Sequence, residues 1–337
     1  MADLKLKASV VIPVKNPGRQ FHNVISMVMA QSAPWPFEVL VIDSGSTDGT
    51  LEYLATVPQV RVERISPSEF GHGKTRNLGV SLTHGEFIAF LTHDAQPADD
   101  RWLANMVHAV EQDSGIAGAF GRHLAYPGAS AFTRRDLTAH FEGFLQFPAV
   151  LERETDAARY ASDPGWRQVV RFYSDNNSCM RRSVWQNIPY PEVEFAEDQI
   201  WAMRIVEAGY KKAYAANAVV YHSHDYGIAE RLRRSFDEAN AFRELFGDRL
   251  CVSLRGWAKS IWGLARRDLA FGRECGLPLK ARWAQVGQIV ALVTGHYLGT
   301  HADTMPPRLK RALSQDKRLL HSLDRPERWS LEPMGKV

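Results

Sequence analysis

The sequence predicts an α/β protein with a Rossmann-like, doubly wound and mostly parallel sheet, followed by a helical C-terminal extension. Short apolar runs alternate with helical patterns through the first two thirds of the chain, which is typical of parallel strands joined by helices. From residue 228 onward the pattern becomes mostly helical and basic. We therefore expect a ligand-binding α/β domain over residues 1–226 and a helical, basic extension over residues 227–337.

Each expected element follows from its apolar pattern. Apolar runs predict strands over residues 8–14, 37–43, 60–65, 87–92 and 116–120, and helical spacing predicts helices over residues 21–30, 50–57, 74–83 and 101–113. The polar segment 151–165 is typical of a loop. Residues 169–173, a helix over residues 198–208 and a strand over residues 219–221 are expected to complete the second half of the fold.

The composition is that of an ordinary globular protein. Forty-one Lys and Arg against 38 Asp and Glu give a net charge of +3, too small to indicate a nucleic-acid partner. The three cysteines, Cys179, Cys251 and Cys275, are too widely spaced for a CxxC zinc site and favour a reducing compartment. No run reaches the roughly twenty apolar residues of a membrane span, and the N-terminus lacks the apolar region of a signal peptide. We expect a cytoplasmic protein.

One candidate metal site lies where two expected strands end. Asp94 closes the apolar run 87–92, and ligands of open α/β sheets collect at the carboxyl ends of strands. Mg²⁺ needs only one or two carboxylates when a substrate diphosphate supplies the other ligands. His222 and His224 follow the expected strand 219–221, and an imidazole ligand would favour Mn²⁺. Because side chains alternate along a strand, only one of the two should face the site. The alternative is a structural role for both histidines.

A candidate nucleotide site lies at the ends of the first two strands. Pro13 cannot donate to a central ladder, so the sheet is expected to open there, and Asn16 follows in a turn-forming segment. Asp43 can accept the imide N–H of uracil or thymine, and Ser44 can donate to oxygens. The alternative is that these segments only form turns and cap the next helix.

Arg76 adds a planar cation at the start of an expected helix. A guanidinium stays charged and suits a nucleotide base or phosphate, although a plain surface charge is the alternative. The preceding Gly73-Lys74-Thr75 resembles the end of a P-loop. The full motif requires glycine at position 68, where this chain has Ser68.

Two further clusters have acid or amide side chains. Glu197 and Asp198 begin an expected helix, where they either complement the helix dipole or provide a general base. Asn176 and Asn177 lie at a polar strand end, where they either contact an acceptor or donor sugar or make structural hydrogen bonds.

Together and in this order, the motifs resemble those of the inverting family 2 glycosyltransferases, which have a GT-A fold. The resemblance extends over residues 9–226, and segments 70–77 and 91–95 are most similar to bacterial rhamnosyltransferases. One departure is Thr92-His93-Asp94, which stands where the family has Asp-x-Asp, so the first carboxylate is missing. The resemblance implies dTDP-L-rhamnose as donor and Mg²⁺ or Mn²⁺ as cofactor. It also implies a hydroxyl of a cell-surface glycan or lipid-linked acceptor, in lipopolysaccharide or exopolysaccharide synthesis.

The resemblance also implies a role for each candidate residue. Asp198 is the catalytic base, and Asp94 with His222 or His224 holds the metal. The donor nucleotide is expected to contact Pro13, Asn16, Asp43, Ser44, Arg76 and His93, and the acceptor or sugar is expected to contact Asn176, Asn177 and Glu197.

Other functions remain open at this point. The donor could be another UDP-, GDP- or dTDP-sugar, because a few pocket side chains decide the sugar. A P-loop NTPase would leave Asp43 and Asp198 unexplained. A sugar-phosphate nucleotidyltransferase needs a glycine-rich basic loop after the first strand, and residues 15–19 match that loop poorly.

The C-terminal extension contains an amphipathic pattern. Leu254, Trp257, Ala258, Ile261 and Ala265 form an apolar stripe, and Arg255, Lys259, Arg266 and Arg267 add positive charge. Such a helix either lies in an anionic membrane interface, here at the inner face of the cytoplasmic membrane, or packs on the catalytic domain or on a second subunit of a homo-oligomer.

Overall fold

The computed structural model describes residues 6–193 and 195–316. The chain forms two compact units. Among the described residues, the first contains those up to Ala129 together with those from Thr133 to Ser223, and the second contains Ser130–Phe132 and residues 224–316. The expected division at residue 226 into a catalytic domain and an extension stays a prediction, because compactness does not test which residues act in catalysis.

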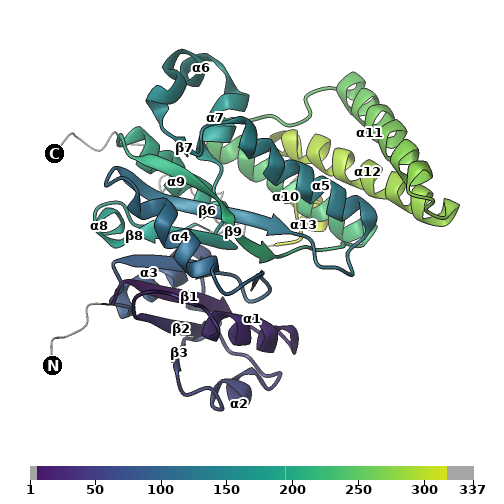
Figure 1. The fold of residues 1–337 in the computed structure, drawn as a ribbon. Helices are drawn as coiled ribbons and strands as arrows, with labels where there is room; N and C mark the ends of the chain where they lie inside the picture. Colours follow the sequence, from purple (N-terminus) through teal and green to yellow (C-terminus); the bar gives the residue numbers. More distant parts are fainter. Residues whose placement is uncertain (1–5, 194, 317–337) are drawn as a thin grey trace, which may run out of the picture. The chain divides into compact units, whose positions relative to one another are not determined.

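The first unit is built on one sheet, which has nine strands among the described residues (Figure 1). The strands are β1 (Ala8–Val14), β2 (Phe37–Asp43), β3 (Val60–Arg64), β4 (Phe87–Leu91), β5 (Gln96–Pro97), β6 (Ile116–Leu124), β7 (Val150–Leu151), β8 (Asn177–Arg181) and β9 (Lys211–Tyr221). Their order is β3-β2-β1-β4-β8-β6-β9-β5, and β7 pairs with β9. Strands β3, β2, β1 and β4 are parallel, as are β6 and β9, whereas β8 runs antiparallel between them. The predicted mostly parallel α/β sheet is confirmed.

Helices cover both faces of this sheet. They are α1 (Gln20–Met29), α2 (Thr50–Leu54), α3 (His72–Leu82), α4 (Trp102–Glu111), α5 (Ala131–Gly143), α6 (Ala157–Ser162), α7 (Pro164–Arg171), α8 (Arg182–Trp185) and α9 (Glu197–Glu207), with 3₁₀ turns η1 (Phe144–Gln146) and η2 (Arg153–Asp156). Alternate residues of β1 enter different cores: Val10 and Ile12 pack on one side and Val11 on the other. A strand buried on both faces explains the continuous apolar runs in the sequence.

Pro13 lies inside β1, where the sheet begins to open. The ladder between β1 and β4 ends at Val11 and Phe90, whereas the ladder between β1 and β2 continues through Pro13 and Ile42. Because proline has no N–H to donate, a position with a single paired neighbour tolerates it. The predicted opening of the sheet is confirmed on the β4 side.

The expected loop over residues 151–165 is wrong. This segment contains the end of β7, then η2, α6 and the start of α7, and residues 169–171, for which no element type was predicted, belong to α7. The helices are short and each buries few apolar residues, Tyr160 in α6 and Trp166 and Val170 in α7. Asp156 and Asp163 cap them by accepting backbone N–H groups, a local signal that a polar composition obscures.

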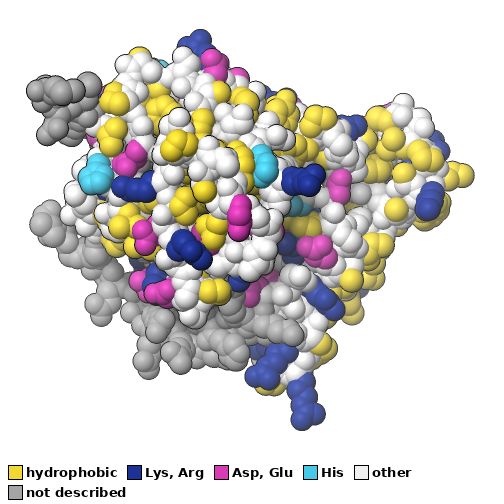
Figure 2. Space-filling model, turned by 90° about the horizontal axis from the view of Figure 1, so that it is seen from below, with side chains coloured by type: hydrophobic (Ala, Val, Ile, Leu, Met, Phe, Trp, Pro, Cys, Tyr) yellow, Lys and Arg dark blue, Asp and Glu magenta, His cyan; other side chains and the backbone are white. Residues whose placement is uncertain are grey.

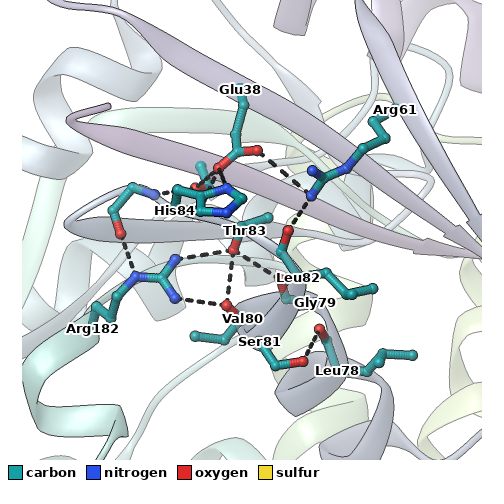
Figure 3. A network of polar contacts seen from close by, with 12 residues as sticks. Glu38, Arg61, Leu78, Gly79, Val80, Ser81, Leu82, Thr83, His84 and Arg182 are labelled. Carbon is teal, nitrogen blue, oxygen red and sulfur yellow. Dashed lines mark hydrogen bonds and ion pairs between the residues drawn. The ribbon is translucent and has the colours of Figure 1, made fainter. Parts of the chain in front are cut away.

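The amino end of β4 is fixed by a polar network around Arg182, the first residue of α8 (Figure 3). Its Nε donates to the Gly85 carbonyl at 2.6 Å and its Nη1 to the Val80 carbonyl at 2.7 Å. Its Nη2 donates to Thr83 Oγ1 at 3.1 Å. The guanidinium therefore satisfies carbonyls at the end of α3, where a positive charge also complements the helix dipole.

The second unit is helical, as predicted. It contains α10 (Ile228–Phe246), α11 (Leu254–Glu274), α12 (Leu279–Thr300), η3 (Ala302–Thr304) and α13 (Pro307–Leu313). Helices α10 and α12 approach closely because a Cβ at Gly295 or Gly299 would lie within 2.5 Å of a backbone oxygen of α10. No helix in the described part of the chain is long and apolar enough to cross a membrane.

Candidate active site

The strand register brings the candidate residues to one edge of the sheet. Val14 pairs with Asp43, so the carboxyl ends of β1 and β2 lie side by side. Leu91 at the end of β4 pairs with Asn177 at the start of β8. The segments that follow β1, β2 and β4, and the one that precedes β8, therefore start from the same edge, where ligands of open α/β sheets collect.

Asn16 and Asp43 organise the loops after β1 and β2. Asn16 has a positive φ of 46°, and its Oδ1 accepts the Thr47 N–H at 2.7 Å while its own N–H donates to Ser46 Oγ at 2.9 Å. The buried Asp43 carboxylate accepts the N–H of Gly45 at 3.0 Å and that of Ser46 at 3.2 Å. These bonds tie the two loops together and fix their shape.

The other predicted nucleotide contacts differ in exposure. Ser44 is buried and its Oγ donates to the Val14 carbonyl at 3.0 Å, so it joins β2 to β1. Asn16 is exposed, and Pro13 and His93 are half-buried. Of these four residues, Asn16 is thus the most accessible to a ligand.

Arg76 lies in a buried ionic cluster, so the alternative that it is a surface charge is wrong. The residue is 4% exposed. Its Nε lies 3.0 Å from Asp175 Oδ2, and its Nη1 donates to Glu197 Oε1 at 2.7 Å and to the His72 carbonyl at 3.2 Å. Arg76 thus connects α3 to the start of α9 and to the segment before β8.

Asp198 lies next to this cluster at the start of α9. Its Oδ2 accepts the Asp175 backbone N–H at 3.2 Å, and its Oδ1 accepts the Gln199 N–H at 2.7 Å. Burial, followed by the negative charges of Glu197 and Asp175, holds the pKa of Asp198 well above its usual range, although Arg76 opposes this. A half-buried carboxylate with a raised pKa is a stronger base than an ordinary surface carboxylate.

Asp175 is a member of this cluster that the sequence analysis missed. It is 2% exposed, and its Oδ1 accepts hydrogen bonds from Ser178 Oγ and Tyr190 Oη, both at 2.7 Å. Burial raises the pKa of Asp175, and the Arg76 charge lowers it. The only local signal was its position one residue before the polar segment that begins at Asn176.

The structure separates the two candidate asparagines. The Asn177 side chain is fully buried: its Oδ1 accepts the Trp102 indole N–H at 2.7 Å, and its Nδ2 donates to the carbonyls of Ala218 at 2.9 Å and Arg122 at 3.2 Å. These bonds favour the structural alternative for Asn177. Asn176 is half-buried and remains the member of the pair that a ligand could reach.

Asp94 and His222 meet because β5 pairs with β9. Gln96, two residues after Asp94, is the antiparallel partner of Tyr221, which precedes His222. Asp94 Oδ1 lies 3.6 Å from His222 Nε2. This distance is too long for a hydrogen bond, and two ligands bound about 2.1 Å from one ion lie about 3–4 Å apart. With His224, two residues further along the chain, they form a group whose ligand atoms all lie within 4.8 Å of one another.

The first unit has an open pocket of about 550 Å³, and some of its lining residues are neighbours of Asp94 and His222 along the chain or by hydrogen bond. Its lining, which the sequence analysis missed, consists of Gln20, Asn23, Gln96, Tyr126, Pro127 and Tyr221. Tyr126 Oη donates to the Asp94 carbonyl at 3.0 Å, and Tyr221 directly precedes His222. The pocket is therefore connected through the backbone to the segments that contain Asp94 and His222.

Comparisons of the sequence with known proteins identify related proteins. The sequence profile of glycosyl transferase family 2 matches residues 9–188. The O-antigen chain rhamnosyltransferase RfbN of Salmonella typhimurium is 34% identical over 236 residues, which cover 69% of this chain and 71% of RfbN. The O-antigen chain rhamnosyltransferase WbaN of Salmonella anatum is 32% identical over 232 residues, which cover 68% of this chain and 70% of WbaN.

Solved structures support the fold. A mannosyltransferase from Pyrobaculum calidifontis, solved in complex with GDP-Man and Mn²⁺, has a TM-score of 0.52 at 18% identity, covering 98% of this chain and 89% of that chain. Residues 1–349 of TarS from S. aureus give a TM-score of 0.50 at 17% identity, covering 90% of this chain and 93% of that chain. The GT-A fold that the motifs implied is confirmed. The chain belongs to glycosyl transferase family 2 and is a glycosyltransferase.

Proposed function

We propose that the protein is an inverting rhamnosyltransferase that transfers L-rhamnose from dTDP-L-rhamnose to a hydroxyl of a bacterial cell-surface glycan, such as an O-antigen, or of its lipid-linked precursor. The observation that carries the proposal is the 34% identity to an O-antigen chain rhamnosyltransferase over 69% of this chain. WbaN, a second relative of that description, supports it over 68%. A cytoplasmic nucleotide-sugar donor fits three free cysteines, two of them buried.

The proposed chemistry depends on Asp198. Three carboxylates, Asp175, Glu197 and Asp198, surround the single guanidinium of Arg76, so the cluster has an excess of negative charge when all are ionised. Asp198 is the member whose pKa is held well above its usual range. It takes the proton of the acceptor hydroxyl while that oxygen bonds to C1 of the sugar and the C1–O bond to the diphosphate breaks. One displacement from the opposite face inverts C1.

The remaining residues have supporting roles in the proposal. Arg76 acts through the carboxylates that it holds and not by contacting the nucleotide, because it is 4% exposed and pairs with Asp175 and Glu197. The donor nucleotide lies against the loops after β1 and β2, where Asn16 is exposed and Asp43 fixes the loop. The acceptor approaches Asn176 and Asp198.

We further propose that a divalent cation is held by Asp94 and His222, with His224 as a further ligand. Carboxylate and imidazole together suit Mn²⁺ better than Mg²⁺, and one carboxylate suffices when a diphosphate completes the coordination. This donor set fits despite the missing first acid of the Asp-x-Asp pattern. A cation bound there offsets negative charge on the departing nucleoside diphosphate.

Nucleoside diphosphate release from a panel of nucleotide sugars tests the donor assignment. The purified protein, with a lipid-linked glycan acceptor and Mg²⁺, Mn²⁺ or chelator, should release dTDP from dTDP-L-rhamnose selectively and only with metal. Preference for another sugar would leave the family standing and overturn the rhamnose donor. Equal release in chelator would overturn the metal role.

The Asp198→Asn variant tests the base in the same assay. Asparagine keeps the shape and accepts the Asp175 N–H but cannot take a proton, so transfer should fall by about 10²–10⁴-fold while donor binding persists. Asp113→Asn, a change to an exposed carboxylate paired with Lys211, is the matched control. Wild-type transfer by Asp198→Asn would assign the base elsewhere.

A further inference from the structure

Helices α11 and α12 of the second unit pack through the stripe that the sequence singled out. Trp257, Ile261 and Ala265 pack against Ile289 and Val293 of α12. Trp257 Nε1 also donates to Thr294 Oγ1 at 3.1 Å. The expected apolar stripe is therefore an intramolecular contact within the extension, and Leu254, at 66% exposed, is its uncovered end. If the extension binds a membrane, a different face must do so.

A second apolar face remains exposed on the same two helices. Trp262 on α11 is 64% exposed, and Trp283 on α12 is 63% exposed. Leu279 is 65% exposed and Val290 39% exposed, and both lie on the Trp283 side of α12 because they are spaced four and seven residues from it. Exposed apolar side chains that gather on one face, bordered by polar residues, are typical of an interaction surface.

The two tryptophans lie on the same side of the helix pair. Along an α-helix each residue is rotated by about 100° from the one before it. Ile261 and Asp268 are the residues of α11 that face α12. The direction of Trp262 around the axis of α11 therefore differs from theirs by about a quarter to a third of a turn. The direction of Trp283 around the axis of α12 differs from that of Ile289, which faces α11, by a similar angle and with the same sign. In two antiparallel helices, residues rotated by equal angles from the contact lie on the same side of the pair. We call this side, which includes Trp262, Leu279, Trp283 and Val290, the tryptophan face.

Basic side chains border the tryptophan face. On α11, Arg255, Lys259, Arg266 and Arg273 recur at helical spacing with Trp262 among them. Between residues 254 and 285 the chain has seven basic and two acidic side chains. One of the acids, Asp268, is buried and accepts bonds from Arg267 and Gln285, both at 2.7 Å. Figure 2 shows hydrophobic and basic side chains gathered at the right, where Figure 1 places α11 and α12.

We propose that the tryptophan face binds an anionic lipid surface. Tryptophan rings insert at the level of the lipid headgroups, and the bordering Arg and Lys side chains attract anionic phosphates. A second copy of the chain fits less well, because a two-fold contact would bring two basic borders of the same sign together. The proposal concerns the second unit and does not depend on which sugar the first unit transfers.

Flotation with vesicles tests the proposal on the full chain. The protein should float with phosphatidylcholine vesicles that contain phosphatidylglycerol and stay in solution with phosphatidylcholine alone. The Trp262→Ala/Trp283→Ala and Arg255→Glu/Arg266→Glu variants should each bind about tenfold or more weakly. The controls are Leu145→Ala, which changes a 57% exposed apolar residue of the first unit, and Arg233→Glu, which reverses an exposed charge on α10. Both should bind like the wild type.

Tryptophan fluorescence and particle mass give independent readouts. Wild-type emission should shift to shorter wavelength with the anionic vesicles, and circular dichroism should show that all variants are folded. Absence of wild-type binding, or equal binding by the double tryptophan variant, would overturn the proposal. So would a wild-type dimer that ignores vesicles and becomes monomeric in the double tryptophan variant, which would identify the face as a subunit contact.

Discussion

At the scale of single residues, the proposed base is held by a strained backbone and a surplus of carboxylates. Ala196, directly before Glu197 and Asp198, has a φ of 55°, and Asn16 in the nucleotide loop has a φ of 46°. They are the non-glycine residues with positive φ among those described. Such strain costs on the order of 1–3 kcal/mol and persists where the surroundings fix it, which is common at functional sites.

The charge of Glu197 should set the pH range of transfer. After burial, Glu197 contributes most to the raised pKa of Asp198. A Glu197→Gln variant removes that repulsion and leaves Arg76 to attract Asp198 more strongly, so the pKa of Asp198 falls. Because the base acts when deprotonated, the acidic limb of kcat/KM against pH should move to lower pH.

The measurement is a pH–rate profile of wild type and Glu197→Gln at saturating metal. Asp113→Asn should leave the acidic limb in place, since this carboxylate is paired with Lys211 at 2.7 Å on the surface. A limb that stays fixed in Glu197→Gln, or moves to higher pH, would contradict the proposed control of Asp198 by its neighbour.

Sequence patterns identified acids of the site but not their partners. Asp94 and Asp198 stand at a strand end and a helix start, positions that local patterns reveal. The burial of Arg76 depends on Asp175 and Glu197, which are 99 and 121 positions away, so no local pattern could show it. Asn177 likewise looked like a sugar contact, because its partner Trp102 lies 75 positions earlier.

At the scale of elements, apolar runs predicted the parallel strands well because each is buried on both faces. The antiparallel insertion of β8 between β4 and β6 was not predictable, since the sequence Asn-Ser-Cys-Met-Arg indicated a polar strand end but not the direction of the strand or its neighbours. The residues just before its amino end, Asp175 and Asn176, belong to the candidate site, whereas its carboxyl end meets the Arg182 network at the opposite edge. The two ends of β8 therefore have different roles: the amino end adjoins the candidate site, and the carboxyl end contributes to stability.

Removing the Arg182 side chain should lower stability without changing donor affinity. Arg182→Ala deletes three bonds to the end of α3 and to the turn before β4, for an expected loss of about 2 kcal/mol in the free energy of unfolding. Urea denaturation measures this loss, and KM for the donor should stay unchanged. Arg153→Ala removes an exposed ion pair instead and should cost less than about 1 kcal/mol. A large rise in KM with unchanged stability would place Arg182 in the site.

At the scale of the whole molecule, the chain divides its proposed tasks between two units. The first contains the sheet, the Arg76 cluster and the loops of the nucleotide site, and the second contains the tryptophan face. The sequence predicted a helical extension but left open whether the apolar stripe of α11 faces a membrane or packs, because the covered face of α11 depends on its contact with α12. Binding of the nucleotide to the first unit can therefore be measured separately from binding of a lipid surface to the second.

Hydrogen exchange should show the nucleoside diphosphate on the first unit alone. With dTDP and Mn²⁺ at about a hundred times the Kd, binding stabilises the bound region by about 2.7 kcal/mol. Amides that can exchange only after the nucleotide has dissociated should then exchange about a hundredfold more slowly. The expected protection covers residues 14–18, 44–48 and 92–95, the loops at the carboxyl edge of the sheet, and spares residues 254–300. Asp94→Ala should lose the protection that depends on Mn²⁺, whereas Asp113→Asn should keep it. Protection confined to residues 254–300 would place the nucleotide site on the second unit and contradict the assignment of these loops. The vesicle experiment would still test the tryptophan face independently.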